Sequence, residues 1–175
     1  MELPAPIRDS TLAHARLSTK SLGNKTSAIP DDLLHAMNRV EGTFLALVLV
    51  QGAHSVEEYF GKLWEVFPPA RFLTGLVSDD RHLGFLVLNV GLFLFGMWCF
   101  LWPVRRRWPS GRIIVGAWIV LEIINGIGHP LWSLRQGGYT AGVATAPILL
   151  ILALALLWQR KAGAIATRLE DNQSP

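Results

Sequence analysis

The chain has 175 residues, of which 51% are hydrophobic and only 17% are charged, and its mean hydropathy is +0.35. This composition is typical of a small integral membrane protein and argues against an ordinary soluble domain. The net charge of +3 and the pI near 9.4 would suit a nucleic-acid partner. We expect no nucleic-acid binding, because the basic residues follow a membrane topology instead.

The chain divides into a tail, a membrane domain and a second tail. Residues 1–36 are polar and are predicted to form an N-terminal tail, either disordered or a lead-in to the first span. Residues 37–160 form the predicted four-span membrane domain, and residues 161–175 a C-terminal tail. Met37 is an alternative start, because it leads directly into the first predicted span.

Four stretches are candidates for membrane spans, which need about 20 mostly apolar residues each. Residues 83–104 and 139–159 contain no charge, and residues 113–134 contain only Glu122. The remaining candidate, residues 42–61, is interrupted by His54, Glu57 and Glu58. The predicted fold is therefore all-α, a four-helix transmembrane bundle.

The connections between the spans carry turn and capping signals. Pro68 and Pro69 should end the first span, and a short interfacial helix is expected over residues 70–77. The Ser-Asp-Asp sequence at 78–80 is expected to cap the second span. Pro130 should bend or end the third span, and Pro147 should kink the fourth.

The basic residues gather on one side of the membrane if the four spans alternate in direction. Twelve of the sixteen Lys and Arg residues then share a side, namely Arg8, Arg16, Lys20, Lys25, Arg39, Arg105, Arg106, Arg107, Arg112, Arg160, Lys161 and Arg168. The positive-inside rule places both termini in the cytoplasm. We expect a multi-pass protein of the cell (inner) membrane, with the lipid bilayer as its first partner.

Polar side chains from all four predicted spans meet at one level, in the outer half of the bundle. The first span brings His54, Glu57 and Glu58 there, although a central charged residue such as Asp costs about 2.5–3.5 kcal/mol on insertion scales. The other spans add His82, Asn89, Glu122, Asn125, His129, Tyr139 and Thr145. Because polar groups at such depth are usually functional, we predict a single intramembrane site.

Three motifs in this order resemble those of the HXXEE family, small bacterial and archaeal membrane proteins of unknown function. The family pattern is H-x-x-E-E, then N-x-x-x-H, then Y-x-P-G-x-x-T. The chain matches it with His54, Glu57, Glu58, Asn125, His129, Tyr139, Gly142 and Thr145. It departs from the pattern at Ala141, where the family has Pro, so the outer turn loses rigidity. The resemblance covers about residues 40 to 158 and implies that these eight residues act together; His82, Asn89 and Glu122 rest on span geometry alone.

One hypothesis for this site is a metal centre. Two imidazoles with one or two carboxylates suit Zn, Fe or Mn, and helical bundles build such sites from facing helices. The candidate ligands are His54, Glu57, Glu58, Glu122 and His129. A bound metal would activate water or oxygen, and the protein would be an enzyme acting on a lipid or isoprenoid, a lipophilic small molecule.

Other hypotheses need no metal. Glu57 or Glu58 would be a general base with His129 as its partner, and Asn89, Asn125, Tyr139, Gly142 and Thr145 would line the polar site. A proton- or cation-coupled transporter would have few spans for a monomer and predicts a homodimer. The site could also be a polar network that only fixes helix packing, as in a structural subunit of a membrane complex. The chain contains no G-x-G-x-x-G or Walker loop, which disfavours nucleotide-driven mechanisms.

Overall fold

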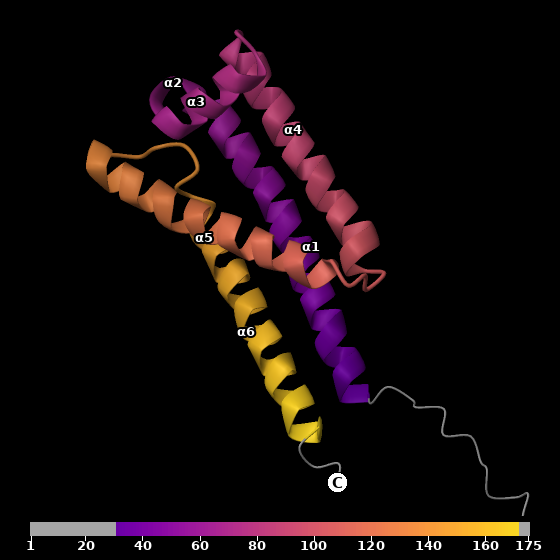
Figure 1. Cartoon of the computed structure of the whole chain (residues 1–175). Helices are drawn as coiled ribbons and strands as arrows, with labels where there is room; N and C mark the ends of the chain where they lie inside the picture. Colours follow the sequence, from indigo (N-terminus) through magenta and orange to yellow (C-terminus); the bar gives the residue numbers. More distant parts are fainter. Residues whose placement is uncertain (1–30, 172–175) are drawn as a thin grey trace, which may run out of the picture. The chain divides into compact units, whose positions relative to one another are not determined.

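The computed structural model describes residues 31–171, and every regular element in this range is helical. Figure 1 shows the long helices α1 (Asp31–Phe60), α4 (Arg81–Cys99), α5 (Gly111–Gln136) and α6 (Ala146–Asp171). The predicted all-α class is therefore confirmed. Most of the predicted N-terminal tail, residues 1–30, lies outside the described residues.

Three helical segments are long and apolar enough to cross a membrane: Arg81–Val104, Gly111–Gln136 and Ala146–Ile165. They correspond to the second, third and fourth predicted spans and indicate a multi-pass membrane protein. Among the described helices α1 does not meet this standard, so three of the four predicted spans are confirmed. The hydropathy of α1 is lowered by the polar run from Gln51 to Glu58 and by charged residues such as Arg39 and Glu41 in its first half.

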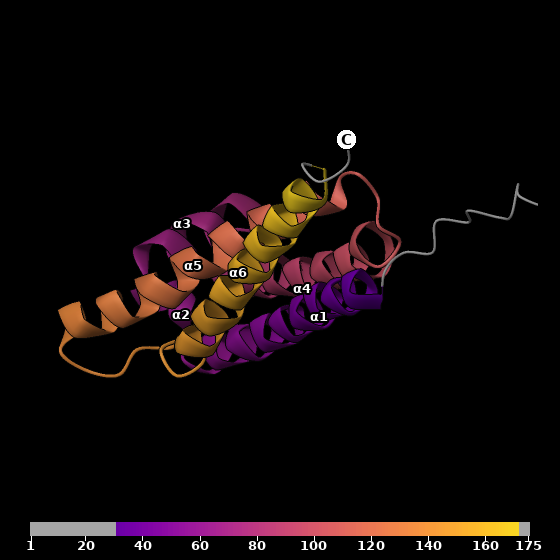
Figure 2. The same cartoon turned by 90° about the horizontal axis from the view of Figure 1, so that it is seen from below.

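Helix α1 lies beside two of the other long helices. Figures 1 and 2 show α4 running antiparallel to α1, while α6 packs against both α1 and α5. Their shared core consists of Phe44, Leu47, Val48, Cys99, Val104, Val115, Trp118, Ile119, Ala153 and Leu156. Along α1 this core occupies the turns that precede the polar run, so an apolar layer separates the polar run from the start of α1.

The connection between α1 and α4 contains the short helices α2 (Leu63–Val66) and α3 (Pro68–Val77). Helix α3 confirms the predicted short helix, although it begins at the prolines, which suit the first turn of a helix. The predicted cap of α4 is also confirmed. The Asp80 carboxylate accepts hydrogen bonds from the backbone N–H groups of His82 and Leu83, at 3.0 and 3.2 Å.

Prolines within the spans disturb the helices less than predicted. Helix α5 continues through Pro130 for six more residues, and the turns after this proline extend past the neighbouring helices (Figure 2). Pro147 is the second residue of α6, where its missing N–H has no helical partner to lose. Pro103 lies in the π-helical segment η1 (Phe100–Val104), which continues α4.

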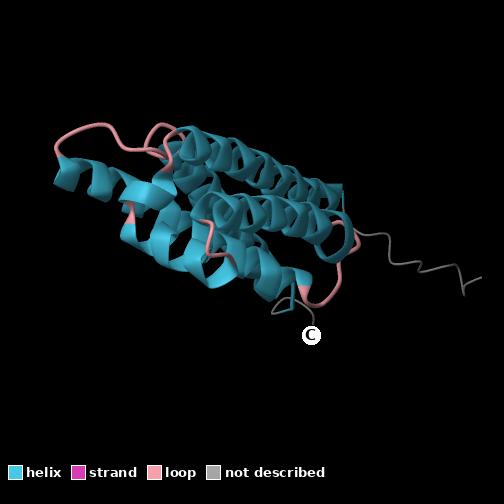
Figure 3. Ribbon diagram, turned by 90° about the horizontal axis from the view of Figure 1, so that it is seen from above, coloured by secondary structure: helices cyan, strands magenta, loops and turns pink. Residues whose placement is uncertain are grey.

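The segment between α5 and α6 is the main departure from the predicted spans. The fourth span was expected from residue 139, but residues 137–145 form a loop and α6 begins only at Ala146 (Figure 3). Gly137 ends α5 in the left-handed conformation, with φ +69°. Tyr139, Gly142 and Thr145 therefore belong to a loop, and this loop reaches back to the end of α1.

Candidate functional site

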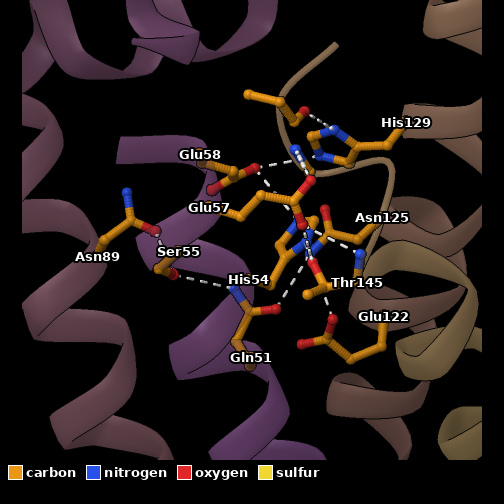
Figure 4. A network of polar contacts seen from close by, with 12 residues as sticks. Gln51, His54, Ser55, Glu57, Glu58, Asn89, Glu122, Asn125, His129 and Thr145 are labelled. Atoms are coloured by element: carbon orange, nitrogen blue, oxygen red, sulfur yellow. Dashed lines mark hydrogen bonds and ion pairs between the residues drawn. The ribbon is translucent and has the colours of Figure 1, made fainter. Parts of the chain in front are cut away.

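Polar side chains gather where the last turns of α1 meet α5 and the 137–145 loop (Figure 4). His54 and Glu122 are fully buried, and Glu58 and His129 are 8% and 3% exposed. An uncompensated charge is costly in such surroundings, so each of these groups requires a partner nearby.

Glu57 is held by the loop. Its Oε1 accepts hydrogen bonds from the Tyr139 hydroxyl at 2.6 Å and from the backbone N–H groups of Gly142 and Ala144 at 3.0 and 3.1 Å. Its Oε2 accepts from the backbone N–H and the hydroxyl of Thr145, at 3.0 and 2.6 Å. The bond to Glu57 raises the pKa of Tyr139, because ionisation would set two negative charges side by side. With five donors around it, Glu57 anchors the loop to α1.

Gly142 makes room for the two histidines of the site. Its φ of +92° is a backbone conformation that residues with side chains rarely adopt. A Cβ atom here would overlap the ring of His129 and lie 2.8 Å from Cε1 of His54. Glycine is thus required by both conformation and space.

Glu58 faces two imidazoles instead of the loop. Its Oε1 lies 3.3 Å from Nε2 of His54 and 3.1 Å from Nε2 of His129. The two rings meet edge to face with centroids 4.7 Å apart. Despite the short distance to Glu58, Nε2 of His54 is buried without a partner of hydrogen-bonding geometry among the described residues. One ligand atom from each of the three residues lies within 4.8 Å of the other two.

The opposite ring nitrogens determine the tautomers of both histidines. Nδ1 of His129 lies 2.9 Å from the carbonyl oxygen of Ala141, and since a carbonyl only accepts, Nδ1 must donate. Nδ1 of His54 lies 2.7 Å from the Thr145 hydroxyl, whose own proton already goes to a carboxylate, so this Nδ1 also donates. In the neutral state both Nε2 atoms therefore carry lone pairs, and both lie against the same Glu58 oxygen.

A second polar group surrounds Glu122 on α5. With its amide nitrogen turned toward α5, Gln51 donates to both Glu122 oxygens, at 3.2 and 2.9 Å. Asn125 donates to Oε2 of Glu122 at 3.3 Å. On α1 the Ser55 hydroxyl donates to Oδ1 of Asn89 at 2.7 Å, which ties α1 to α4. The partners of the Glu122 carboxylate are therefore side-chain amides. No Lys or Arg among the described residues forms an ion pair with it.

The structure brings together part of the predicted metal-ligand set. His54, Glu58 and His129 form one group, while Glu57 is bonded to the loop and Glu122 to amides outside that group. Among the predicted polar-site residues, Tyr139 and Thr145 bind Glu57, Asn125 binds Glu122, and Asn89 binds Ser55. His82 lies apart and contacts the Tyr59 hydroxyl at 2.9 Å.

Two members of the network, Gln51 and Ser55, were missed from the sequence. Gln51 precedes His54 by three residues and Ser55 precedes Glu58 by three, which puts all four on one face of α1 and is a readable signal. The Ala141 carbonyl and the loop N–H groups carry no such signal, because they are backbone groups whose positions depend on the loop conformation.

Comparison with known proteins identifies one family. The model of a family described as "Protein of unknown function with HXXEE motif" matches residues 44–157. No curated protein and no solved structure matches the chain. The matched range contains every residue of the two polar groups described above.

Proposed function

We propose that this chain, which belongs to the HXXEE family, binds a divalent transition-metal ion at His54, Glu58 and His129 and uses it to act on a lipophilic substrate. One observation carries the proposal: two histidines, both donating from Nδ1, place their Nε2 lone pairs beside the same carboxylate oxygen. Three acceptor atoms this close repel one another unless a positive charge lies among them.

A metal ion accounts for this arrangement better than a proton does. A proton on Nε2 of His129 would satisfy its contact with Glu58, whereas Nε2 of His54, 3.3 Å from the same oxygen, lacks hydrogen-bonding geometry. A metal ion engages all three atoms. The two distances from Glu58, 3.1 and 3.3 Å, are close to the roughly 3.3 Å between neighbouring ligands of a tetrahedral site with bonds of about 2.0–2.1 Å, and all three atoms lie within 4.8 Å of one another.

The hydrogen bonds at Nδ1 also support a metal. Histidines that bind metals usually donate their other ring N–H to a carbonyl, a carboxylate or water, which fixes the ring and makes it a better ligand. Here the Ala141 carbonyl and the Thr145 hydroxyl take these places. Three protein ligands leave coordination positions open, which favours a catalytic site for Zn, Fe or Mn that activates water or oxygen.

The membrane location supports a lipid or isoprenoid substrate. Helix α1 is proposed as a fourth span beside the three candidate spans, because partners within the protein compensate its buried acids. Both termini are then proposed to lie in the cytoplasm. A cavity of about 460 Å³ opens beside the 137–145 loop. Two of its lining residues, Pro130 and Val143, directly follow His129 and Gly142 in sequence.

An enzyme is favoured over a transporter by the core. The buried cluster around Phe44, Trp118 and Leu156 lies between the His–Glu group and the first turns of α1. Transport needs a polar path to both sides of the membrane, whereas an enzyme site needs access from one side only.

Metal content tests the proposal. Full-length protein purified in detergent is expected to hold about one Zn, Fe or Mn per chain by elemental analysis, and His54→Ala or His129→Ala should each lose most of it. His82→Ala, which removes a histidine outside the group, should retain it. Folded wild-type protein that takes up no stoichiometric metal, even after dialysis against Zn²⁺, Fe²⁺ or Mn²⁺, would overturn the proposal.

The substrate class needs a separate measurement. Metal-loaded wild type and Glu58→Gln are incubated with a total lipid extract, and lipid masses are compared by mass spectrometry. We expect a lipid or isoprenoid species to change only with the wild type. If the wild type binds metal but no lipid mass changes specifically with it, the protein would be a metal-binding protein and the proposed enzymatic activity would be refuted.

A further inference from the structure

A second hollow lies at the other end of the helices, about 20 Å along α1 from the His–Glu group. Its volume is about 410 Å³, and α1, η1, α6 and the start of α5 contribute to it. Val40, Pro103, Val104 and Val115 give it an apolar wall, and Trp108 stands at its side, 42% exposed.

Three arginines, Arg107, Arg112 and Arg160, also line this hollow, against a single acid, Glu41. Arg107 is matched by Glu41, with Nε and Oε1 3.5 Å apart. No carboxylate of the described side chains forms an ion pair with Arg112 or Arg160. The hollow therefore keeps a net positive charge on an apolar background.

Arg112 and Arg160 both line the hollow, and Gly116 gives the Arg160 guanidinium room beside α5. Arg160 of α6 crosses α5 there, and its Nη1 lies only 2.9 Å from where a Cβ of Gly116 would be. Arg112 is one turn before Gly116 on α5 and so shares its face. Among the described side chains neither cation has a carboxylate partner, and the positive end of the α5 dipole lies near Arg112.

We propose that this hollow binds one anionic phospholipid, with its phosphate between Arg112 and Arg160 and the upper part of an acyl chain along Val104 and Val115. One guanidinium group can donate two parallel hydrogen bonds to a phosphate. Basic pockets between transmembrane helices are suited to anionic headgroups. The apolar wall and the adjacent Trp108, at the end of the candidate spans, favour a lipid over a free anion. This site is separate from the proposed metal centre and does not depend on it.

The experiment measures lipid affinity of the full-length protein in detergent. Delipidated protein is titrated with phosphatidylglycerol, with phosphatidylcholine and with inorganic phosphate, and bound lipid is counted by native mass spectrometry. We expect one tight phosphatidylglycerol per chain, with phosphatidylcholine and inorganic phosphate at least tenfold weaker. Equal affinity for inorganic phosphate, equal affinity for phosphatidylcholine, or no tight binding of phosphatidylglycerol would each overturn the proposal.

A matched pair of double variants locates the site. Arg112→Gln with Arg160→Gln removes two charges from the hollow, and Arg105→Gln with Arg106→Gln removes two from the neighbouring exposed run. The first pair should weaken phosphatidylglycerol binding about tenfold or more and the second less than threefold. Equal losses in both would show a general charge effect and refute the site. Helicity by circular dichroism and the thermal unfolding temperature check that the first pair still folds. Arg112→Lys with Arg160→Lys, which keeps the charge, should recover most of the affinity.

Discussion

Glu57 and Glu58 are adjacent in α1, yet their surroundings are opposite in kind. Glu57 receives five hydrogen bonds from hydroxyl and backbone donors of the loop. Glu58 faces two histidine nitrogens that carry lone pairs in the neutral state. Since neighbours on a helix point about 100° apart, one dipeptide can serve two regions at once.

The difference separates a structural role from a chemical one. A carboxylate that is fully hydrogen-bonded has no capacity left for a ligand, whereas Glu58 still needs a positive partner. The two regions remain connected, because the Thr145 hydroxyl donates to Glu57 and accepts from Nδ1 of His54. The loop held by Glu57 therefore sets the orientation of a histidine that belongs to the region of Glu58.

Gly142→Ala should remove both regions together and have the largest effect. The added Cβ meets both imidazoles at a φ of +92°, and strain plus overpacking should destabilise the protein by about 3 kcal/mol or more. Unfolding in detergent and metal content measure the outcome. Gly138→Ala is the control, because a Cβ there meets nothing within 4 Å. Equal stability of the two variants would contradict the described loop.

Glu58→Gln should break the chemical region alone. Loss of the anionic ligand is expected to weaken Zn²⁺ binding at least about 100-fold, or roughly 2.7 kcal/mol. The stability of the metal-free protein should change little, because a buried charge is removed at the same time. Calorimetric titration measures the Zn²⁺ affinity, and chemical unfolding measures the stability of the metal-free protein. If the variant binds Zn²⁺ as tightly as the wild type, Glu58 is not a metal ligand.

Glu57→Gln should show the reverse pattern. Its amide cannot accept all five donors, so the metal-free protein should lose about 2 kcal/mol of stability. Metal affinity should fall only about tenfold, through the loosened Thr145 and His54. If Glu57→Gln lost metal as completely as Glu58→Gln, the separation of roles between the two acids would be refuted.

Tyr139→Phe should have the smallest effect, below about 1 kcal/mol, because the hydroxyl it removes is exposed. The pKa of Tyr139 is raised in the fold, so its contribution is complete below the unfolded value of about 10 and is lost as the pH rises through the folded value. The difference in melting temperature from the wild type should thus be present at pH 8 and shrink above pH 10. A difference that grows with pH would contradict the bond to Glu57.

The sequence predicts the helices better than it predicts the site. Apolar length identified the spans over residues 83–104 and 113–134, and the motif spacing brought His54, Glu58 and His129 into one candidate set. It also predicted a helix from residue 139, because residues 139–145 are apolar enough to continue α6 toward its N-terminus. The loop replaces that helix because its backbone N–H groups donate to Glu57 instead of to helical carbonyls. The partners in these bonds are 85 to 88 residues apart in sequence, so no local pattern reveals them.

The bonds between Glu57 and the loop also order events during synthesis. Glu57 leaves the ribosome long before Thr145, so α1 must remain in the membrane or at its surface with its acids unpartnered until α5 and the loop have followed. Neither histidine is oriented until that late docking, because His129, Ala141 and Thr145 all come from the later part of the chain. Loading of the proposed metal would then be the last step of biogenesis, and a chain truncated before the loop would emerge without it.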